Sequence, residues 1–242
     1  MAENKRPKIV PQLRRVQAGI PGLDRLVEGG LVENSLVVLR GDTGTGKTIF
    51  ALQFIYEGIT KYNAPGLYLS FNEDKEATYA HGMEFGWDFR KLEEDGKFAF
   101  IHYEPHEVVR VMEEGGGTIR DQLEAIRARR LVVDPITPFT MVFNDPYKEN
   151  EAIMELFSMF RNWNCTALII SDARASLTGG EKTERAVVLA DAVINMYYTR
   201  EGPSRARMLE VLKMKDTAHT ERLIPFVFTS GGLEVHDGKQ RK

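Results

Sequence analysis

Residues 35–48 read S-L-V-V-L-R-G-D-T-G-T-G-K-T, and an amphipathic stretch with helical spacing follows from Lys47 to Ile59. The last eight residues match the pattern G-x-x-x-x-G-K-[ST], with the apolar strand before it and the helix after it that this pattern requires. Its glycines permit positive φ angles and let backbone N–H groups approach phosphates closely. The helix N-terminus adds free N–H groups and the positive end of its dipole. The stretch therefore predicts a phosphate-binding loop, and we take its ligand to be ATP.

We expect the nucleotide to be bound by the whole loop and by the residue after it. These residues are Gly41, Asp42, Thr43, Gly44, Thr45, Gly46, Lys47, Thr48 and Ile49. Lys47 would reach the β- and γ-phosphates and is also a catalytic candidate, and the Thr48 hydroxyl would hold Mg²⁺. Asp134 ends the apolar strand from Arg130 to Asp134, as in a Walker B element, and would orient the magnesium through water.

Hydrolysis requires a group that positions or activates the attacking water. The predicted strand from Gly66 to Phe71 is followed by Asn72, Glu73 and Asp74. If this strand neighbours the strand of the phosphate loop, Glu73 lies beside the γ-phosphate as the natural base. The alternative is that Glu73 and Asp74 only place negative charge in the first turn of the next helix, where acidic side chains are favourable.

Strands and helices alternate along the first three quarters of the chain. This order is typical of βαβ units and predicts an α/β fold around a mostly parallel sheet. After residue 190 the sequence instead predicts strands separated by turns, without a long helix between them. We expect these to be antiparallel strands that complete the sheet. Pro105 argues against a helix that would align His102 with His106, so we expect no metal site from this pair. The expected strands are 35–40, 66–71, 97–103, 130–134, 166–171, 192–200, 206–215 and 225–229, and the expected helices are 47–59, 74–85, 118–129 and 149–162.

Length and composition favour a single globular domain. The chain has 242 residues, of which 43% are hydrophobic and 28% charged, and its formal net charge is −3. This charge excludes a uniformly basic nucleic-acid binder. No apolar run approaches the roughly 18 residues of a membrane helix, and the single cysteine, Cys165, excludes an internal disulfide, so we expect a cytoplasmic protein without a membrane partner. We expect a flexible basic arm at 1–15, one ATPase domain at 16–236 and a frayed tail at 237–242.

The sequence resembles the KaiC-like branch of the RecA-type ATPases. The resemblance begins with Arg15-Val16-Gln17-Ala18-Gly19-Ile20-Pro21-Gly22-Leu23-Asp24, Gly29-Gly30-Leu31 and the phosphate loop. It continues through Pro65-Gly66, Phe85-Gly86-Trp87-Asp88, Arg129-Arg130 and Lys213-Met214-Lys215-Asp216-Thr217-Ala218-His219. It covers essentially the whole chain as one KaiC-type domain. It implies a RecA-type P-loop NTPase fold and a ring, usually a hexamer, with ATP at each subunit boundary.

The resemblance also implies residues that act across that boundary. Lys213 and Lys215 would be cationic fingers on the neighbour's γ-phosphate, where they would stabilise the charge that develops in phosphoryl transfer. Thr217 and His219 would lie near the ribose and base. The alternative for this segment is an exposed basic strand edge, on which lysines discourage edge-to-edge pairing.

Three residues depart from the family pattern. The family has two adjacent glutamates at this strand end, and the first is usually assigned as the base. Asn72 stands at that first position, and only the second glutamate, Glu73, remains. An amide can orient water but cannot accept its proton. Lys215 stands where arginine is usual and lacks the planar fork of a guanidinium group. Asp216 stands where glycine is usual. These departures put hydrolysis in more doubt than nucleotide binding.

Three functions therefore remain open. The chain is a ring-forming ATPase, a nucleotide-gated scaffold that has lost its base and binds a protein partner, or a recombinase-like DNA-binding ATPase. The loops at 135–148 and 172–185 would face a central channel and could contact protein or nucleic acid. Thr178 and Thr183 in the second loop are available for autophosphorylation, although no pattern identifies either as a target.

Overall fold

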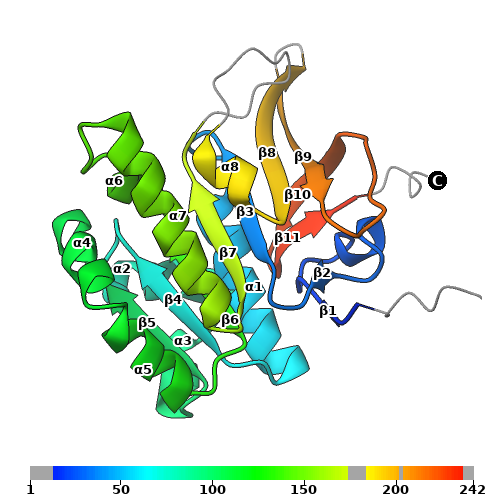
Figure 1. The fold of residues 1–242 in the computed structure, drawn as a ribbon. Helices are drawn as coiled ribbons and strands as arrows, with labels where there is room; N and C mark the ends of the chain where they lie inside the picture. The colour runs from blue at the N-terminus through cyan, green and yellow to red at the C-terminus, as the bar shows by residue number, and fades with distance from the viewer. Residues whose placement is uncertain (1–12, 174–183, 202–203, 237–242) are drawn as a thin grey trace, which may run out of the picture.

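A computed structural model describes residues 13–173, 184–201 and 204–236, and Figure 1 shows its fold. Within these ranges the main sheet has nine strands in the order β11-β10-β9-β8-β3-β7-β6-β4-β5. Strands β8, β3, β7, β6, β4 and β5 are parallel to one another, whereas β9 is antiparallel to β8 and the pairs β9–β10 and β10–β11 are antiparallel. The predicted α/β fold, with a mostly parallel sheet and antiparallel C-terminal strands, is confirmed.

The central strands are buried on both faces, because helices cover the sheet on either side (Figure 1). Alternate residues of a strand point to opposite faces. In β3, Val37 and Leu39 therefore join one core with helix α1, and Leu36 and Val38 join the other with helix α7. We call these the α1 face and the α7 face. The parallel strands are β3 (Leu36–Gly41), β4 (Gly66–Ser70), β5 (Phe98–His102), β6 (Arg130–Asp134), β7 (Thr166–Ser171) and β8 (Ala192–Glu201).

Helix α1 is the element that connects the phosphate loop to the core. Its residues Phe50, Leu52 and Phe54 are fully buried on the α1 face. Arg130 is buried beneath it, donates to the Phe54 carbonyl oxygen at 2.7 Å, and lies 4.5 Å from the Phe54 ring, so the helix is fixed to the beginning of β6. The α1 face is completed by α1 (Lys47–Tyr62), α2 (Lys75–Met83) and α3 (Phe89–Glu94).

The other face carries the helices that follow β5. One of them starts at a proline: Pro105 is the first residue of α4, a position where its missing N–H is tolerated. A helix therefore starts at Pro105, but it does not include His102, which ends β5, so the helix that would align His102 with His106 does not form. The α7 face is covered by α4 (Pro105–Glu113), α5 (Gly117–Ala125), α6 (Thr137–Thr140), α7 (Pro146–Asn162) and α8 (Arg185–Leu189).

Strands β10 and β11 complete the main sheet, whereas β1 and β2 pair in a separate two-stranded sheet, and both terminal segments contact α1. Gln53 of α1 donates to the Gly19 and Leu233 carbonyl oxygens and accepts from the Leu233 N–H, which ties both ends to the helix. Arg15, which we assigned to the flexible arm, lies instead in a strand and donates to the Val27 and Gly30 carbonyl oxygens. Residues 1–12 and 237–242 lie outside the described ranges. The remaining elements are β1 (Arg15–Val16), the 3-10 helix η1 (Asp24–Leu26), β2 (Leu31–Val32), β9 (Ser204–Met214), β10 (Ile224–Thr229) and β11 (Gly232–Val235).

Candidate nucleotide site

The phosphate loop leaves the carboxyl edge of the sheet, where the parallel strands end. It connects the end of β3 at Gly41 to the first residue of α1, Lys47. Gly44 and Gly46 have φ angles of +81° and +102°, in the region that glycine tolerates and other residues avoid. The fully buried Thr45 hydroxyl donates to the Asp42 carbonyl oxygen at 2.8 Å and braces the loop from inside. The first turn of α1 thus directs its N–H groups toward the space enclosed by the loop.

The ammonium group of Lys47 is held by oxygens of its own chain. Its Nζ donates to the Gly41 carbonyl oxygen at 2.7 Å and the Asp42 carbonyl oxygen at 3.2 Å, and it lies 3.0 Å from Asp172 Oδ1. Lys47 is buried, whereas the Asp172 side chain is 43% exposed. A triphosphate in the loop would offer the same cation stronger anionic partners, so Lys47 is oriented for the role that its position in the motif predicts.

Thr48 and Asp134 lie together beneath the loop, on the α1 face. The buried Asp134 carboxylate accepts hydrogen bonds from the Tyr68 and Thr48 hydroxyl groups. Burial raises the pKa of Asp134 to about 6; these two hydrogen bonds oppose the rise, and the nearby Asp172 and Glu73 charges add to it. A hydroxyl group beside a desolvated carboxylate is a suitable ligand set for Mg²⁺, since a divalent cation would relieve the unfavourable negative charge. The residues present therefore fit the metal that the motif implies.

The segment after β4 lies at the same recess, although β4 does not have the neighbour that we expected. Our condition that β4 neighbours β3 is not met, because β7 and β6 lie between them. Asn72 and Glu73 nevertheless line one recess together with Thr48 and Asp134, because α1 crosses over the intervening strands. The Ser70 hydroxyl fixes this turn by donating to the Glu73 carbonyl oxygen at 2.6 Å and accepting from the Glu73 N–H at 3.0 Å.

The two acids of this segment have different roles in the structure. Asp74 is the N-cap of α2 and accepts from the Ala77 N–H at 2.8 Å, so the alternative of helix stabilisation applies to Asp74. Glu73 precedes the N-cap residue and does not cap the helix. Its Oε2 lies 3.3 Å from Nε2 of His81, and its side chain is 38% exposed. Glu73 is therefore the carboxylate at this strand end that faces the recess.

Lys213 and Lys215 lie at the opposite edge of the sheet, where the parallel strands begin. Met214 pairs with Ala192 of β8, which pairs with Val37 near the start of β3. The part of β3 between Val37 and Gly41 spans roughly 13 Å at about 3.3 Å per residue, and the phosphate loop begins only beyond it. The two lysines therefore lie far from the phosphate loop of their own subunit.

At this amino edge the two lysines are held by their own chain. Lys215 Nζ lies 2.9 Å from Asp191 Oδ1, and Lys213 Nζ donates to the Val188 carbonyl oxygen at 3.3 Å. Asp191 also accepts from both terminal nitrogens of Arg161 and from the Leu36 N–H, and these donors lower its pKa to about 2 against the opposing effect of burial. Burial and the neighbouring Lys215 charge lower the pKa of Lys213.

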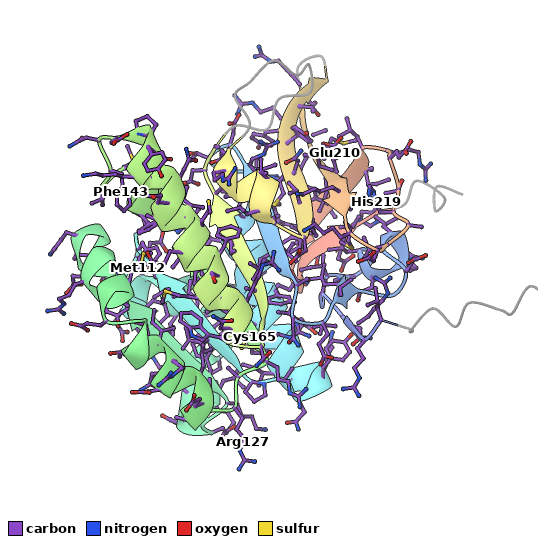
Figure 2. The ribbon with its side chains drawn as sticks, in the orientation of Figure 1. Met112, Arg127, Phe143, Cys165, Glu210 and His219 are labelled. Carbon is purple, nitrogen blue, oxygen red and sulfur yellow. The ribbon has the colours of Figure 1, made fainter. Side chains whose placement is uncertain are left out.

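Thr217 and His219 follow at the same side of the molecule. The Thr217 hydroxyl accepts from Arg15 Nη1 at 3.0 Å, and His219 Nδ1 lies 3.1 Å from the Thr220 carbonyl oxygen. Figure 2 shows His219 beside the C-terminal strands, away from Met112 and Phe143 on the helical side. Asp216 has a φ of +54°, which explains why the family pattern has glycine there and why aspartate, one of the side chains that tolerate this region, can replace it.

Of the two loops that we expected to face a channel, the first is fully described and the second only in part. Residues 135–148 contain α6 and the start of α7, and Phe139 in this segment is fully buried. Thr178, Thr183 and most of the second loop lie outside the described residues. None of the helices in the described ranges is both long and apolar enough to cross a membrane.

Sequence reasoning missed several residues of these clusters, among them Asp172, Tyr68 and Asp191. Asp172 could have been found by the argument that selected Asp134, because it also follows a parallel strand at the carboxyl edge. Tyr68 and Asp191 gave no such signal. Tyr68 reaches Asp134 only because β4 and β6 are adjacent, and Asp191 reaches Lys215 and Arg161 only through the packing of β3, β9 and α7.

Comparison with known proteins agrees with this geometry. Residues 16–240 match the family model described as "ATPase: KaiC". The chain is 31% identical to a UPF0273 protein of Methanocaldococcus jannaschii, with 95% of this chain and 99% of that protein covered. It is 26% identical to the circadian clock oscillator protein KaiC of Synechococcus elongatus, with 92% of this chain but 44% of that protein covered.

A solved structure gives the same result for the fold. The crystal structure of a KaiC-like protein from Pyrococcus horikoshii superposes with a TM-score of 0.82 at 32% identity and covers 93% of this chain and 100% of that one. The phosphate loop, the strand order and these similarities identify an ATP-binding P-loop protein with a RecA-type fold. The chain belongs to the KaiC ATPase family.

Proposed function

We propose that the chain is a subunit of a homo-oligomeric ring, with six as the expected number of copies, that binds Mg-ATP and hydrolyses it slowly at each subunit boundary. The observation that carries this proposal is the separation of two sets of cations. Lys47 lies at the carboxyl edge of the sheet, and Lys213 and Lys215 lie at the amino edge. A second copy that places its amino edge against the first copy's loop would bring both sets to one nucleotide.

The identity of the recess residues supports slow rather than fast hydrolysis. Asn72 cannot accept a proton, so Glu73 is the candidate base, and its carboxylate is paired with His81 in this structure. Lys47 would bind the β- and γ-phosphates, Thr48 and Asp134 would hold Mg²⁺, and the neighbour's Lys213 and Lys215 would face the γ-phosphate. Thr217 and His219 of the neighbour would lie by the ribose and base. We place this ring in the cytoplasm, and its central channel would receive a protein or nucleic-acid partner.

The first test is steady-state Mg-ATP hydrolysis by wild type, Lys47→Ala and Asn72→Glu. We expect slow turnover in wild type, none above background in Lys47→Ala and faster turnover in Asn72→Glu, because the substitution restores a second carboxylate. Stimulation by single-stranded DNA with a strong salt dependence would instead favour the recombinase-like function.

A mixing experiment tests the shared site directly. Lys47→Ala subunits keep their amino-edge lysines, and Lys213→Ala/Lys215→Ala subunits keep their phosphate loop. Each protein alone should be inactive, but a mixed ring contains boundaries at which an intact loop faces intact lysines. We expect mixing to restore hydrolysis. If the Lys213→Ala/Lys215→Ala protein alone turned over ATP at the wild-type rate, hydrolysis would not use these lysines.

Asn72 supports a second candidate, a nucleotide-gated scaffold. In that case wild type would bind Mg-ATP and assemble, as measured by analytical ultracentrifugation with and without nucleotide, but would show no turnover. Activity gained by Asn72→Glu would then identify the missing carboxylate as the reason.

A further inference from the structure

Tyr68 lines the same recess as Thr48, Glu73 and Asp134, and its hydroxyl group donates a hydrogen bond to the Asp134 carboxylate. We propose that Tyr68 is a positioning residue of the magnesium site, which fixes the direction in which Asp134 presents its free carboxylate oxygen. The proposal deepens the function proposed above and rests on it. It concerns a residue of β4, whereas the expected magnesium anchors lie on α1 and β6.

The position of Tyr68 is fixed by the register of two parallel strands. In that register Ser70 of β4 lies opposite Asp134 of β6, and Tyr68 lies opposite Val132. Residues two apart on a strand share a face, so Tyr68 and Asp134 both point to the α1 face. The phenol is long enough to reach from its own position to the carboxylate at the end of the neighbouring strand, which is where the hydrogen bond forms.

The ring of Tyr68 has little freedom to move. Its side chain is buried to 1% exposure, and its ring stacks on Phe100 with a centroid distance of 5.8 Å and an interplanar angle of 13°. A donor held this rigidly restrains the carboxylate that accepts from it. Partners of this kind, one step removed from the metal, commonly change metal affinity by about 10–100-fold when they are removed.

Thr48 and Tyr68 would have different roles once magnesium is bound. In this structure both hydroxyl groups donate to Asp134. The Thr48 hydroxyl is a direct magnesium ligand in the role its position in the motif predicts, and as a ligand its oxygen faces the metal. Tyr68 would then remain as the side-chain donor that holds Asp134 in place. Its hydroxyl therefore has a purpose that a phenylalanine of the same shape could not serve.

The test is Tyr68→Phe, which removes one oxygen atom and keeps the ring. Tyr79→Phe is the matched control, because Tyr79 is also buried and donates to a carboxylate, Glu93 Oε2 at 3.0 Å, but lies outside the residues that line the recess. A fluorescent ATP analogue would be titrated in EDTA and then at increasing Mg²⁺. We expect Tyr68→Phe to need about 10–100-fold more Mg²⁺ for half-maximal effect, with unchanged binding in EDTA and a wild-type response in Tyr79→Phe.

A double substitution shows whether Tyr68 acts through Asp134. Adding Tyr68→Phe to Asp134→Asn should change the Mg²⁺ requirement little, since the group being positioned is already altered. An unchanged Mg²⁺ requirement in Tyr68→Phe, or an equal loss of binding in EDTA, would overturn the proposal and leave a purely structural hydroxyl. Failure of wild type to bind the analogue at all would instead remove the proposed function, and the positioning role with it.

Discussion

The two edges of the sheet hold their cations in different ways. At the carboxyl edge, Lys47 is buried and held by two backbone carbonyl oxygens of the loop as well as by Asp172. At the amino edge, the side chain of Lys215 is 55% exposed, and its ammonium group pairs with Asp191, a carboxylate that Arg161 already neutralises. The first edge is a formed phosphate site, whereas the second presents a cation that a new anion can take over.

The two edges differ in what the loss of a lysine would leave behind. Asp191 keeps the Arg161 and Leu36 hydrogen bonds when Lys215 leaves, so release of the lysine leaves no buried carboxylate without partners. Removing Lys47 from the loop without a nucleotide would instead leave carbonyl oxygens and a buried cation unsatisfied. The carboxyl edge therefore has the geometry of the half that binds the nucleotide, and the proposed ring would use the amino edge as the half that a neighbour receives.

The largest effect should come from breaking the carboxyl edge. Lys47→Ala removes the cation that would bind the β- and γ-phosphates. We therefore expect the rate of hydrolysis to fall about 10²–10³-fold, together with a loss of nucleotide affinity. Lys61→Ala is the control, because Lys61 lies at the other end of the same helix, is exposed and pairs with Glu57. Steady-state turnover and equilibrium binding would be measured for both. Wild-type turnover in Lys47→Ala would contradict the assignment of the site.

A second effect at the same edge concerns the base. Glu73→Gln keeps the size of the side chain but removes its ability to accept a proton, and we expect turnover to fall about 10–10²-fold while Mg-ATP binding is retained. Asp74→Asn is the neighbouring control, since Asp74 caps α2 and asparagine caps a helix almost equally well. Single-turnover kinetics with preformed complexes separates binding from chemistry. Equal turnover in wild type and Glu73→Gln would exclude Glu73 as the base.

The carboxyl edge was also the more predictable of the two. The phosphate loop, Thr48 and Asp134 could be located because each is a local pattern at the end of an apolar strand. Their meeting follows from a parallel sheet, in which carboxyl ends share one edge. Glu73 was selected for a reason that the strand order contradicts, since β4 does not adjoin β3, yet it reaches the recess because α1 crosses the sheet.

The amino edge could not be predicted from local patterns. Lys213 and Lys215 were identified only by resemblance, and the network around Asp191 joins side chains from α7, from the turn after β9 and from the turn before β8. Short elements were missed for a similar reason. Helix α4 begins at a proline, and β11 is a strand of four residues whose place is fixed by pairing with β10 rather than by its own sequence. Such contacts depend on tertiary packing, which a single sequence does not display.

A smaller effect is expected at the amino edge, where a substitution should lower the stability of the fold without changing nucleotide binding at the carboxyl edge. Asp191→Asn removes the charge that Arg161 and Lys215 share, and we expect the free energy of unfolding to fall by about 2 kcal/mol, because hydrogen bonds to charged groups contribute about 1.5–3 kcal/mol. Binding of Mg-ATP to the loop should be unchanged. Asp121→Asn, at an exposed position of α5, is the control. Denaturant unfolding would measure the difference, and an unchanged midpoint would mean that the network does not stabilise the fold.

The smallest effect concerns pH at the carboxyl edge. Asp134 has a pKa raised from 3.8 to about 6, with burial as the main cause. Because the folded-state pKa is higher than the ordinary one, ionising Asp134 destabilises the metal-free fold; this loss begins above pH 3.8 and is complete above about pH 6. Magnesium requires the ionised form. Its apparent affinity should therefore fall as the pH drops below about 6, approaching roughly tenfold per pH unit.

The control for this prediction must remove the titration of the nucleotide itself, whose terminal phosphate also gains a proton in this range. Asp134→Asn provides it, because the asparagine cannot titrate while the nucleotide still does. The ratio of wild-type to Asp134→Asn magnesium affinity should be constant above about pH 7 and decline below about pH 6. A ratio that stays constant to pH 5 would mean that Asp134 is ionised throughout and that its burial is offset by donors such as Tyr68. In the same titration Asp191, whose pKa is about 2, should stay ionised, so the amino edge should keep its ion pairs while the carboxyl edge loses its metal.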